Sequence, residues 1–427
     1  MLSFSFKFLF LLQLFLIIPY TLSQSSLWTL QLLDLTTYPA AQCLDGSPGG
    51  YYIQPGIGEN ASKWVIHIQG GGFCTSIEDC IIRASGFSPY NQTSLGGSGT
   101  WARNASCPET TQAPVCVADG GANGWLSSNN TINPEFSTWS KVYLGYCDGA
   151  SFSGYMVEPL IINSTTSLYF RGKRILEAIV SELVPLTKGA TDIIIKGCSA
   201  GGVSVFLNAD RMAWQFLLHN PMAKVIAAPG AGFLLDLPTY QGNYFFRQLM
   251  QDIFNLHNVT GDDDCMQFYT PVGLQYKCFI PQYTLQFIHT PLFMSNSLAD
   301  LAQQSAVMNI SCIPTAPQGK PGACDSDQVA YLNNFREQMI LAAQPLLENP
   351  QNGVFLLECS IHVIEDDSGS WNSILVQGQT QSETFTAWYY QQPGKAYQVI
   401  DSNTWTLNGS TNPTCNLYTA KHRELFV

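Results

Sequence analysis

The fold of this chain is decided at Lys196-Gly197-Cys198-Ser199-Ala200-Gly201-Gly202, which follows directly on the apolar run Ile193-Ile194-Ile195. The apolar run predicts a strand, the glycines a sharp turn, and the apolar spacing from Val203 to Ala209 a helix packed on the strand. This order is typical of a nucleophile elbow, in which the serine backbone is strained and a neighbouring Cβ would clash. A Gly/Ser turn alone would explain the glycines but not the flanking strand and helix. We therefore expect Ser199 to be an exposed nucleophile.

A second glycine run, Gly70-Gly71-Gly72, follows the apolar strand expected at Trp64–Gln69. Ester hydrolysis through a tetrahedral oxyanion needs backbone N–H donors, and residues without side chains let a carbonyl approach them closely. We expect Gly71, Gly72 and Ala200, the residue after the nucleophile, to form an oxyanion hole. A flexible loop at a strand end would explain the glycines alone, but not their pairing with a serine elbow downstream.

Four motifs resemble, in sequence and order, those of the pectin acetylesterase family, which also contains the Notum carboxylesterase. They are Cys43–Ser47, Gln69–Cys74, Tyr146–Gly154 and Gly197–Gly202. The resemblance extends from about Cys43 to Trp371 and lies closest to the plant-type enzymes. It departs where Phe73 replaces the usual Trp, and where Val363-Ile364 follows His362 in place of the usual Cys-Gln.

A serine triad in this fold class has the chain order Ser, Asp or Glu, His. The histidines after Ser199 are His219, His257, His289, His362 and His422. His362 follows the apolar run Val354–Leu357, a strand-then-loop placement suited to a general base, and the family has its histidine there. Asp300 ends the strand expected over Pro291–Ser297, where the family has its triad aspartate. A helix cap is the alternative role for Asp300.

Strands that alternate with helices predict an α/β-hydrolase-like three-layer sandwich with a mostly parallel central sheet. Helices are expected at Gly172–Leu186 and Gln328–Leu347. Long disulfide-pinned loop insertions are expected at 86–138, where Cys107 and Cys116 lie, and at 255–289 and 313–325. We expect one catalytic domain at 24–427. Four aromatic residues either line its pocket or belong to its core: Phe73, Trp125, Phe152 and Trp371.

Residues 1–23, with Lys7 before an apolar run from Phe8 to Ile18, predict a secretory signal peptide, and thirteen cysteines then predict disulfides. The odd count leaves one thiol, which we assign to Cys198; a thiol nucleophile at this position is the alternative to Ser199. The sequence favours a secreted or extracellular protein, or one in a vacuolar or lysosome-like compartment. Eight glycosylation sequons add to this interpretation: Asn60, Asn91, Asn104, Asn129, Asn163, Asn258, Asn309 and Asn408.

The charge balance is acidic, with 19 Lys+Arg against 31 Asp+Glu and a net charge of −12. Loss of Lys7 with the signal peptide makes it −13. This argues against nucleic acid as a partner and against simple electrostatic capture of polyanionic pectin. No metal-ligand spacing and no later membrane-spanning stretch is evident in the sequence, so we expect neither a metal site nor stable membrane insertion.

These observations predict a serine carboxylesterase that removes O-acetyl groups through an acyl-Ser199 intermediate. The resemblance implies pectin or a similar acetylated polysaccharide as the substrate, and no cofactor. In this mechanism His362 transfers the proton and Asp300 orients His362, while Asp148 organises a neighbouring loop. A Notum-like deacylase of longer acyl chains on protein or lipid is one alternative. A non-enzymatic carbohydrate-binding relative is another.

Overall fold

A ten-stranded sheet lies at the centre of the molecule. The computed structural model describes residues 28–86, 96–98, 104–105, 124–310, 312, 323–365 and 368–417. Within these ranges the strands lie in the order β12-β11-β10-β9-β8-β3-β5-β2-β1-β4. Their bounds are β1 Trp28–Leu32, β2 Gly50–Gln54, β3 Lys63–Ile68, β4 Asn104–Ala105, β5 Ser140–Leu144, β8 Asp192–Cys198, β9 Lys224–Gly230, β10 Phe293–Ser297, β11 Gly353–Leu357 and β12 Gln398–Ile400. Two small hairpins join β6 Leu160–Ile161 to β7 Ser167–Leu168, and β13 Trp405–Thr406 to β14 Gly409–Ser410.

Most of the sheet is parallel. The seven neighbouring strands from β12 to β5 pair in parallel, while β2, β1 and β4 continue one edge in antiparallel pairs. Every residue of β8 except Asp192 is buried. A parallel strand covered on both faces needs such a continuous apolar run, which Ile193-Ile194-Ile195 supplies. The mostly parallel α/β sheet expected from the sequence is confirmed.

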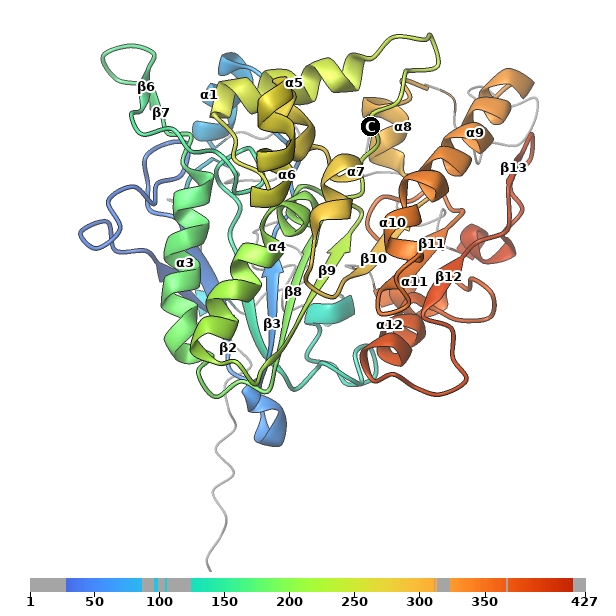
Figure 1. Cartoon of the computed structure of the whole chain (residues 1–427), viewed down its shortest axis with the longest axis horizontal. Coiled ribbons are helices and arrows are strands. Elements are labelled where there is room, and N and C mark those ends of the chain that lie inside the picture. Colours follow the sequence, from blue (N-terminus) through green and yellow to red (C-terminus); the bar gives the residue numbers. More distant parts are fainter. Residues whose placement is uncertain are drawn as a thin grey trace, which may run out of the picture.

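Helices flank the sheet (Figure 1). Their bounds are α1 Ile77–Ala84, α3 Gly172–Leu186, α4 Ala200–His219, α5 Phe245–His257, α6 Asp263–Tyr269, α7 Pro281–Thr284, α8 Leu301–Ala306, α9 Ser326–Ala342, α10 Gln344–Leu347, α11 Ser368–Ser373 and α12 Gln381–Tyr389. Helix α4 packs on β3, β8 and β9 and crosses in front of them in Figure 1. The predicted helix at Gly172–Leu186 is confirmed, and the one at Gln328–Leu347 is divided. Pro345 has no backbone N–H to continue α9, so a new helix begins at Gln344.

The segment 255–289 is not the loop insertion that we expected. It contains the end of α5, the helices α6 and α7, and the 3₁₀ turns Thr270–Val272, Gln275–Phe279 and Leu285–Phe287. The carboxylate of Asp262 caps α6 by accepting from the Cys265 N–H at 3.0 Å. A disulfide then joins Cys265 to Cys278. These helices are too short to show the apolar periodicity by which a long helix is recognised in a sequence.

Disulfides pin the fold, as expected. The described residues form five: Cys43–Cys147, Cys74–Cys80, Cys265–Cys278, Cys312–Cys324 and Cys359–Cys415. The predicted signal peptide, Cys107 and Cys116 lie outside the described residues. No helix in the described ranges is both long and apolar enough to span a bilayer.

Three of the four aromatic residues considered for the pocket belong to the core. Trp125 and Trp371 are each 1% exposed, and Phe152 is fully buried. The Trp125 ring lies 5.0 Å from that of Trp371, with Phe136 and Phe385 in the same cluster. The fourth residue is half-buried Phe73, which packs edge-on against Phe279.

Candidate functional site

Ser199 lies at the strained turn that its sequence predicts. β8 ends at Cys198, α4 begins at Ala200, and Ser199 between them has φ 56° and ψ −127°, in a region that residues with a Cβ rarely adopt. Its N–H donates to the Gly230 oxygen at 3.0 Å. A Cβ at Gly201 would fall on the carbonyl oxygen of Ile68 in β3, so this position admits no side chain. The turn therefore requires glycine where the motif has it.

The three side chains predicted to form a triad are connected by hydrogen bonds through His362. His362 Nε2 is 2.8 Å from Ser199 Oγ. The other ring nitrogen, Nδ1, is 2.9 and 3.0 Å from the two Asp300 oxygens. Asp300 follows β10 and His362 follows β11, and these strands are parallel neighbours. Their carboxyl ends bring both residues to the edge of the sheet where Ser199 leaves β8.

Asp300 caps a helix and also contacts His362. It is the N-cap of α8, and its carboxylate accepts from the Gln303 N–H at 3.0 Å. The same carboxylate contacts His362. The Asp300 side chain is fully buried, and a buried carboxylate is stable only when hydrogen-bond donors surround it. The helix cap therefore fixes the oxygen atoms that face the imidazole.

The contacts of His362 fix its tautomer. A carboxylate only accepts, so Nδ1 donates to Asp300 and the unprotonated Nε2 accepts a hydrogen bond from the Ser199 hydroxyl. Burial lowers the pKa of His362, but the charge and hydrogen bond of Asp300, with a smaller contribution from Glu365, outweigh it and leave the pKa raised. Sequence analysis did not identify Glu365, because its distance from His362 depends on the loop between them.

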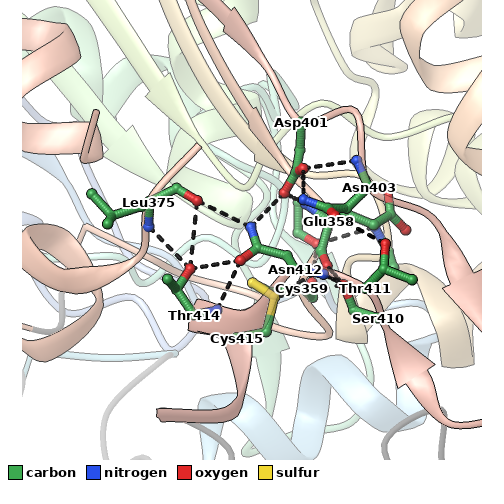
Figure 2. The surroundings of a disulfide bond; sticks show 12 residues. Glu358, Cys359, Leu375, Asp401, Asn403, Ser410, Thr411, Asn412, Thr414 and Cys415 are labelled. Carbon is green, nitrogen blue, oxygen red and sulfur yellow. Dashed lines mark hydrogen bonds between the residues drawn. A yellow bond between two sulfur atoms is a disulfide. The ribbon is translucent and has the colours of Figure 1, made fainter. Parts of the chain in front are cut away.

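The loop that carries His362 is anchored by the surroundings of the Cys359–Cys415 disulfide, which Figure 2 shows. The Asp401 carboxylate accepts from the Glu358 N–H at 3.0 Å and from the Asn412 amide at 2.6 Å. The Glu358 carbonyl in turn accepts from the Ser410 hydroxyl at 2.5 Å. His362 is thus held only three residues from a covalent cross-link.

The glycine run at the end of β3 lies beside the elbow. A Cβ at Gly70 would be 2.5 Å from the Cys198 oxygen and 3.0 Å from Ser199 Cβ, so the missing side chain lets the two turns meet. Gly71 has φ 144° and Gly72 has φ 65°, both positive values that favour glycine. Within the described chain, the N–H groups of Gly71, Gly72 and Ala200 have no protein acceptor. They remain available to an oxyanion.

Asp148 shapes the loop that follows β5. Its buried carboxylate accepts from the N–H groups of Ala150 at 3.3 Å and Phe152 at 3.1 Å. Burial raises the pKa of Asp148 to about 7, although these hydrogen bonds act in the opposite direction. These contacts agree with the loop-organising role that we expected.

Two groups of residues bear on thiol and metal chemistry: the Cys198 thiol, and the cluster of Cys74, Cys80 and His257. Cys198 is buried and is not part of a disulfide, as expected for the odd cysteine. The sulfur atoms of Cys74 and Cys80 and a nitrogen of His257 lie within 4.8 Å of one another, a spacing that could hold a metal ion. These two sulfurs are joined in a disulfide, so neither is available as a thiolate ligand.

Similar proteins are carboxylic ester hydrolases by name. Pectin acetylesterase 5 of Arabidopsis thaliana is 32% identical over 392 residues, covering 89% of this chain and 84% of the relative. Pectin acetylesterase 4 of the same plant is 30% identical, with 89% and 87% covered. The palmitoleoyl-protein carboxylesterase NOTUM of Schmidtea mediterranea is 27% identical, with 91% and 69% covered. The pectinacetylesterase family model matches residues 21–416, and the chain belongs to the pectin acetylesterase family.

Proposed function

We propose that the protein is a serine carboxylesterase whose catalytic residues are Ser199, His362 and Asp300. The observation that supports this most directly is the hydrogen-bonded array of the three side chains at a strained strand-to-helix turn. In the proposed mechanism His362 accepts the proton of Ser199 as the oxygen attacks the ester carbonyl. Asp300 stabilises the imidazolium, and the N–H groups of Gly71, Gly72 and Ala200 hold the oxyanion. His362 then protonates the leaving alcohol, and water releases the acid from acyl-Ser199.

The proposed fold is α/β-hydrolase-like, with a single catalytic domain at 24–427. Three features support it: the elbow between β8 and α4, a second N–H source in the loop after β3, and the triad order Ser, Asp, His. The neighbouring carboxyl ends of the parallel strands are where this class of sheet builds its site.

We also propose that the protein is secreted and glycosylated. Five disulfides within the described residues suit an oxidising compartment. Among the sequon asparagines in these ranges, Asn129, Asn163, Asn258, Asn309 and Asn408 are exposed, and Asn60 is half-buried. Glycan mass on the secreted protein, removed by an endoglycosidase, tests this proposal.

For the substrate, we propose an O-acetyl ester of pectin or a similar polysaccharide. The support is the similarity to pectin acetylesterases 5 and 4 of Arabidopsis thaliana, at 32% and 30% identity, compared with 27% identity to the NOTUM of Schmidtea mediterranea. A long acyl chain would need a deep apolar tunnel, and each buried methylene would add about 0.8 kcal/mol of binding. An acetylesterase should therefore show no steep rise in kcat/KM with chain length.

The first experiment tests the reaction with p-nitrophenyl acetate. We expect Ser199→Ala and His362→Ala each to lower turnover by several orders of magnitude, since triad residues act as a unit. Cys198→Ala is the matched control, one residue away, and should keep most of the activity. Loss of turnover in Cys198→Ala with normal turnover in Ser199→Ala would instead identify a thiol nucleophile.

The second experiment tests the substrate. Rates on p-nitrophenyl acetate, butyrate, octanoate and palmitate are measured together with acetate release from acetylated pectin and acetylated xylan. We expect acetyl to be preferred and at least one polysaccharide to release acetate. A rate that climbs toward octanoate, with no acetate from either polymer, would favour a deacylase of longer chains. No Ser199-dependent turnover on any ester would favour the carbohydrate-binding alternative.

A further inference from the structure

Four consecutive backbone carbonyls after β3 are each bound by a buried side chain. The residues that supply these carbonyls are Gly71, Gly72, Phe73 and Cys74, and the donors are Arg83, Tyr146 and His257. We propose that these three are positioning residues that hold the oxyanion loop, defined as residues 70–74, in its catalytic conformation. The inference rests on the proposed esterase function. None of the three was singled out as a site residue from the sequence.

Arg83 binds two of the four carbonyls. Its guanidinium donates to the Gly71 oxygen at 2.9 Å and to the Phe73 oxygen at 2.8 Å. Arg83 lies in the last turn of α1 with its side chain 1% exposed, and Asp79 is 3.9 Å away. A buried cation is costly unless hydrogen-bond acceptors or an anion surround it. Arg83 therefore acts as a two-pronged clamp on the loop rather than as part of a surface ion pair.

Tyr146 binds the carbonyl between them. Its hydroxyl donates to the Gly72 oxygen at 2.7 Å and accepts from the Ser151 N–H at 3.1 Å. The Ser151 hydroxyl donates to the Ala200 oxygen at 2.7 Å. Burial raises the pKa of Tyr146, so the phenol keeps its proton. This chain of contacts connects the oxyanion loop to the first residue of α4.

His257 binds the last carbonyl. Its Nε2 lies 3.1 Å from the Cys74 oxygen, and the side chain is fully buried at the end of α5. Burial lowers the pKa of His257 to about 4, so at neutral pH the ring is uncharged. Because a carbonyl only accepts, the ring proton is on Nε2. The disulfide Cys74–Cys80 joins this end of the loop to α1, the helix that bears Arg83.

In a planar trans peptide, the C=O of one residue and the N–H of the next residue point in opposite directions. Binding the Gly71 carbonyl aims the Gly72 N–H away from Arg83. The Gly72 carbonyl lies in the next peptide plane, which ends in the Phe73 N–H. Its hydrogen bond to Tyr146 therefore adds no further oriented donor, but it fixes the ψ angle of Gly72, the residue whose N–H is aimed at the oxyanion. Gly71 and Gly72 have no side chain that could resist a peptide flip, so the three donors supply that resistance. Preorganised N–H groups stabilise an oxyanion because they need no reorientation during the reaction.

The test compares Tyr146→Phe, Arg83→Lys and Arg83→Met with Tyr389→Phe. Tyr389 is the matched control, because its buried hydroxyl donates to Asp192 at the opposite end of β8 from Ser199. Tyr146→Phe should lower kcat on p-nitrophenyl acetate roughly ten- to a hundred-fold, with KM unchanged within about two-fold. The oxyanion forms only in the transition state, so misplaced N–H donors weaken transition-state binding and not substrate binding. Arg83→Lys retains the charge but not the planar guanidinium that binds two carbonyls, so its kcat should lie between those of wild type and Arg83→Met.

A second measurement does not depend on activity. The Cys74 N–H donates to the Gly149 oxygen at 2.8 Å, so its hydrogen exchange reports on the loop. We expect faster exchange in Tyr146→Phe than in Tyr389→Phe. Unchanged kcat, or a rise in KM alone, overturns the proposal. If the wild-type protein shows no Ser199-dependent turnover, the proposed function fails instead. The exchange rates then decide whether the three buried donors hold the oxyanion loop. Equal rates in Tyr146→Phe and Tyr389→Phe overturn the proposal.

Discussion

At the scale of single residues, the proposed mechanism ties the pH range of activity to the raised pKa of His362. The imidazole must be neutral to accept a proton, and the negative charges of Asp300 and Glu365 favour its protonated form. We therefore expect kcat/KM to be low below the pKa of His362 and to rise as the pH passes through it. That pKa should exceed the ordinary histidine value of 6.5.

Glu365→Gln should shift this acid limb to lower pH. Removal of the carboxylate charge destabilises the imidazolium, so the base is neutral over a wider range, and the shift should be roughly half a unit. A pH–rate profile of kcat/KM measures it. Asp236→Asn, which removes a buried carboxylate paired with Arg247, serves as the control and should leave the limb in place. A shift to higher pH in Glu365→Gln would contradict the assignment.

The residues of the candidate site differ in how far they could be recognised from the sequence. Ser199, Gly71 and Gly72 belong to short motifs whose backbone demands appear in the sequence itself. Asp300 and His362 were located by chain order and by the family resemblance, and the structure places His362 between Asp300 and Ser199, in contact with both. Arg83 and His257 belong to no such motif, and Tyr146 begins the motif Tyr146–Gly154 without any indication there of its contact with Gly72. Their side chains bind backbone carbonyls. Every residue has such a carbonyl, so the residue types of the loop do not indicate these contacts.

At the scale of elements, the elbow requires close contact between α4 and β3. Gly201→Ala would place a Cβ on the Ile68 oxygen, whereas an alanine at Gly189 meets nothing within 4 Å. We expect Gly201→Ala to destabilise the protein by roughly 1–3 kcal/mol or more, because backbone atoms cannot yield as a side chain can. Thermal unfolding of the two variants checks this. Equal melting temperatures would show that α4 can move away from β3 freely.

The loop after β11 gives a second prediction at this scale. The Cys359–Cys415 bridge closes a 56-residue span, and the chain-entropy model assigns such a bridge about 4 kcal/mol of stability. The double variant Cys359→Ser/Cys415→Ser should lose stability and also kcat, since His362 lies on this loop. The Cys265→Ser/Cys278→Ser variant, which removes a bridge from α6, is the control. It should lose stability with kcat nearly retained at a temperature where both variants are folded.

Long elements were easier to predict than short ones. Helix α3 was predicted with its observed bounds, because its fifteen residues repeat the apolar spacing over four turns. Helices α6 and α7 have seven and four residues, and the same periodicity cannot be recognised over so few. Their segment was therefore expected as a loop, and its helices depend instead on caps, Pro281 and a disulfide.

At the scale of the whole molecule, the net charge of −12 opposes a polyanionic substrate. On acetylated pectin, we expect kcat/KM to rise several-fold as the salt concentration is raised from about 10 to 200 mM, because salt screens the repulsion. On acetylated xylan, whose backbone is uncharged, the change should stay within about two-fold. Acetate release at several salt concentrations measures both. A rate on pectin that falls with salt would reveal a local basic surface that outweighs the overall field.

The backbone of Ser199 has a further consequence for the stability of the molecule. Its φ of 56° and ψ of −127° cost a residue with a Cβ about 1–3 kcal/mol, more than the roughly 0.5–1 kcal/mol by which glycine usually destabilises a chain. Ser199→Gly should therefore melt at a higher temperature than Ser199→Ala, which retains the Cβ, although both are expected to be inactive. A lower melting temperature for Ser199→Gly would contradict the strain at the elbow. Directed evolution for heat resistance alone should thus select Ser199→Gly, and a descendant gene no longer selected for turnover could gain stability by losing the proposed nucleophile.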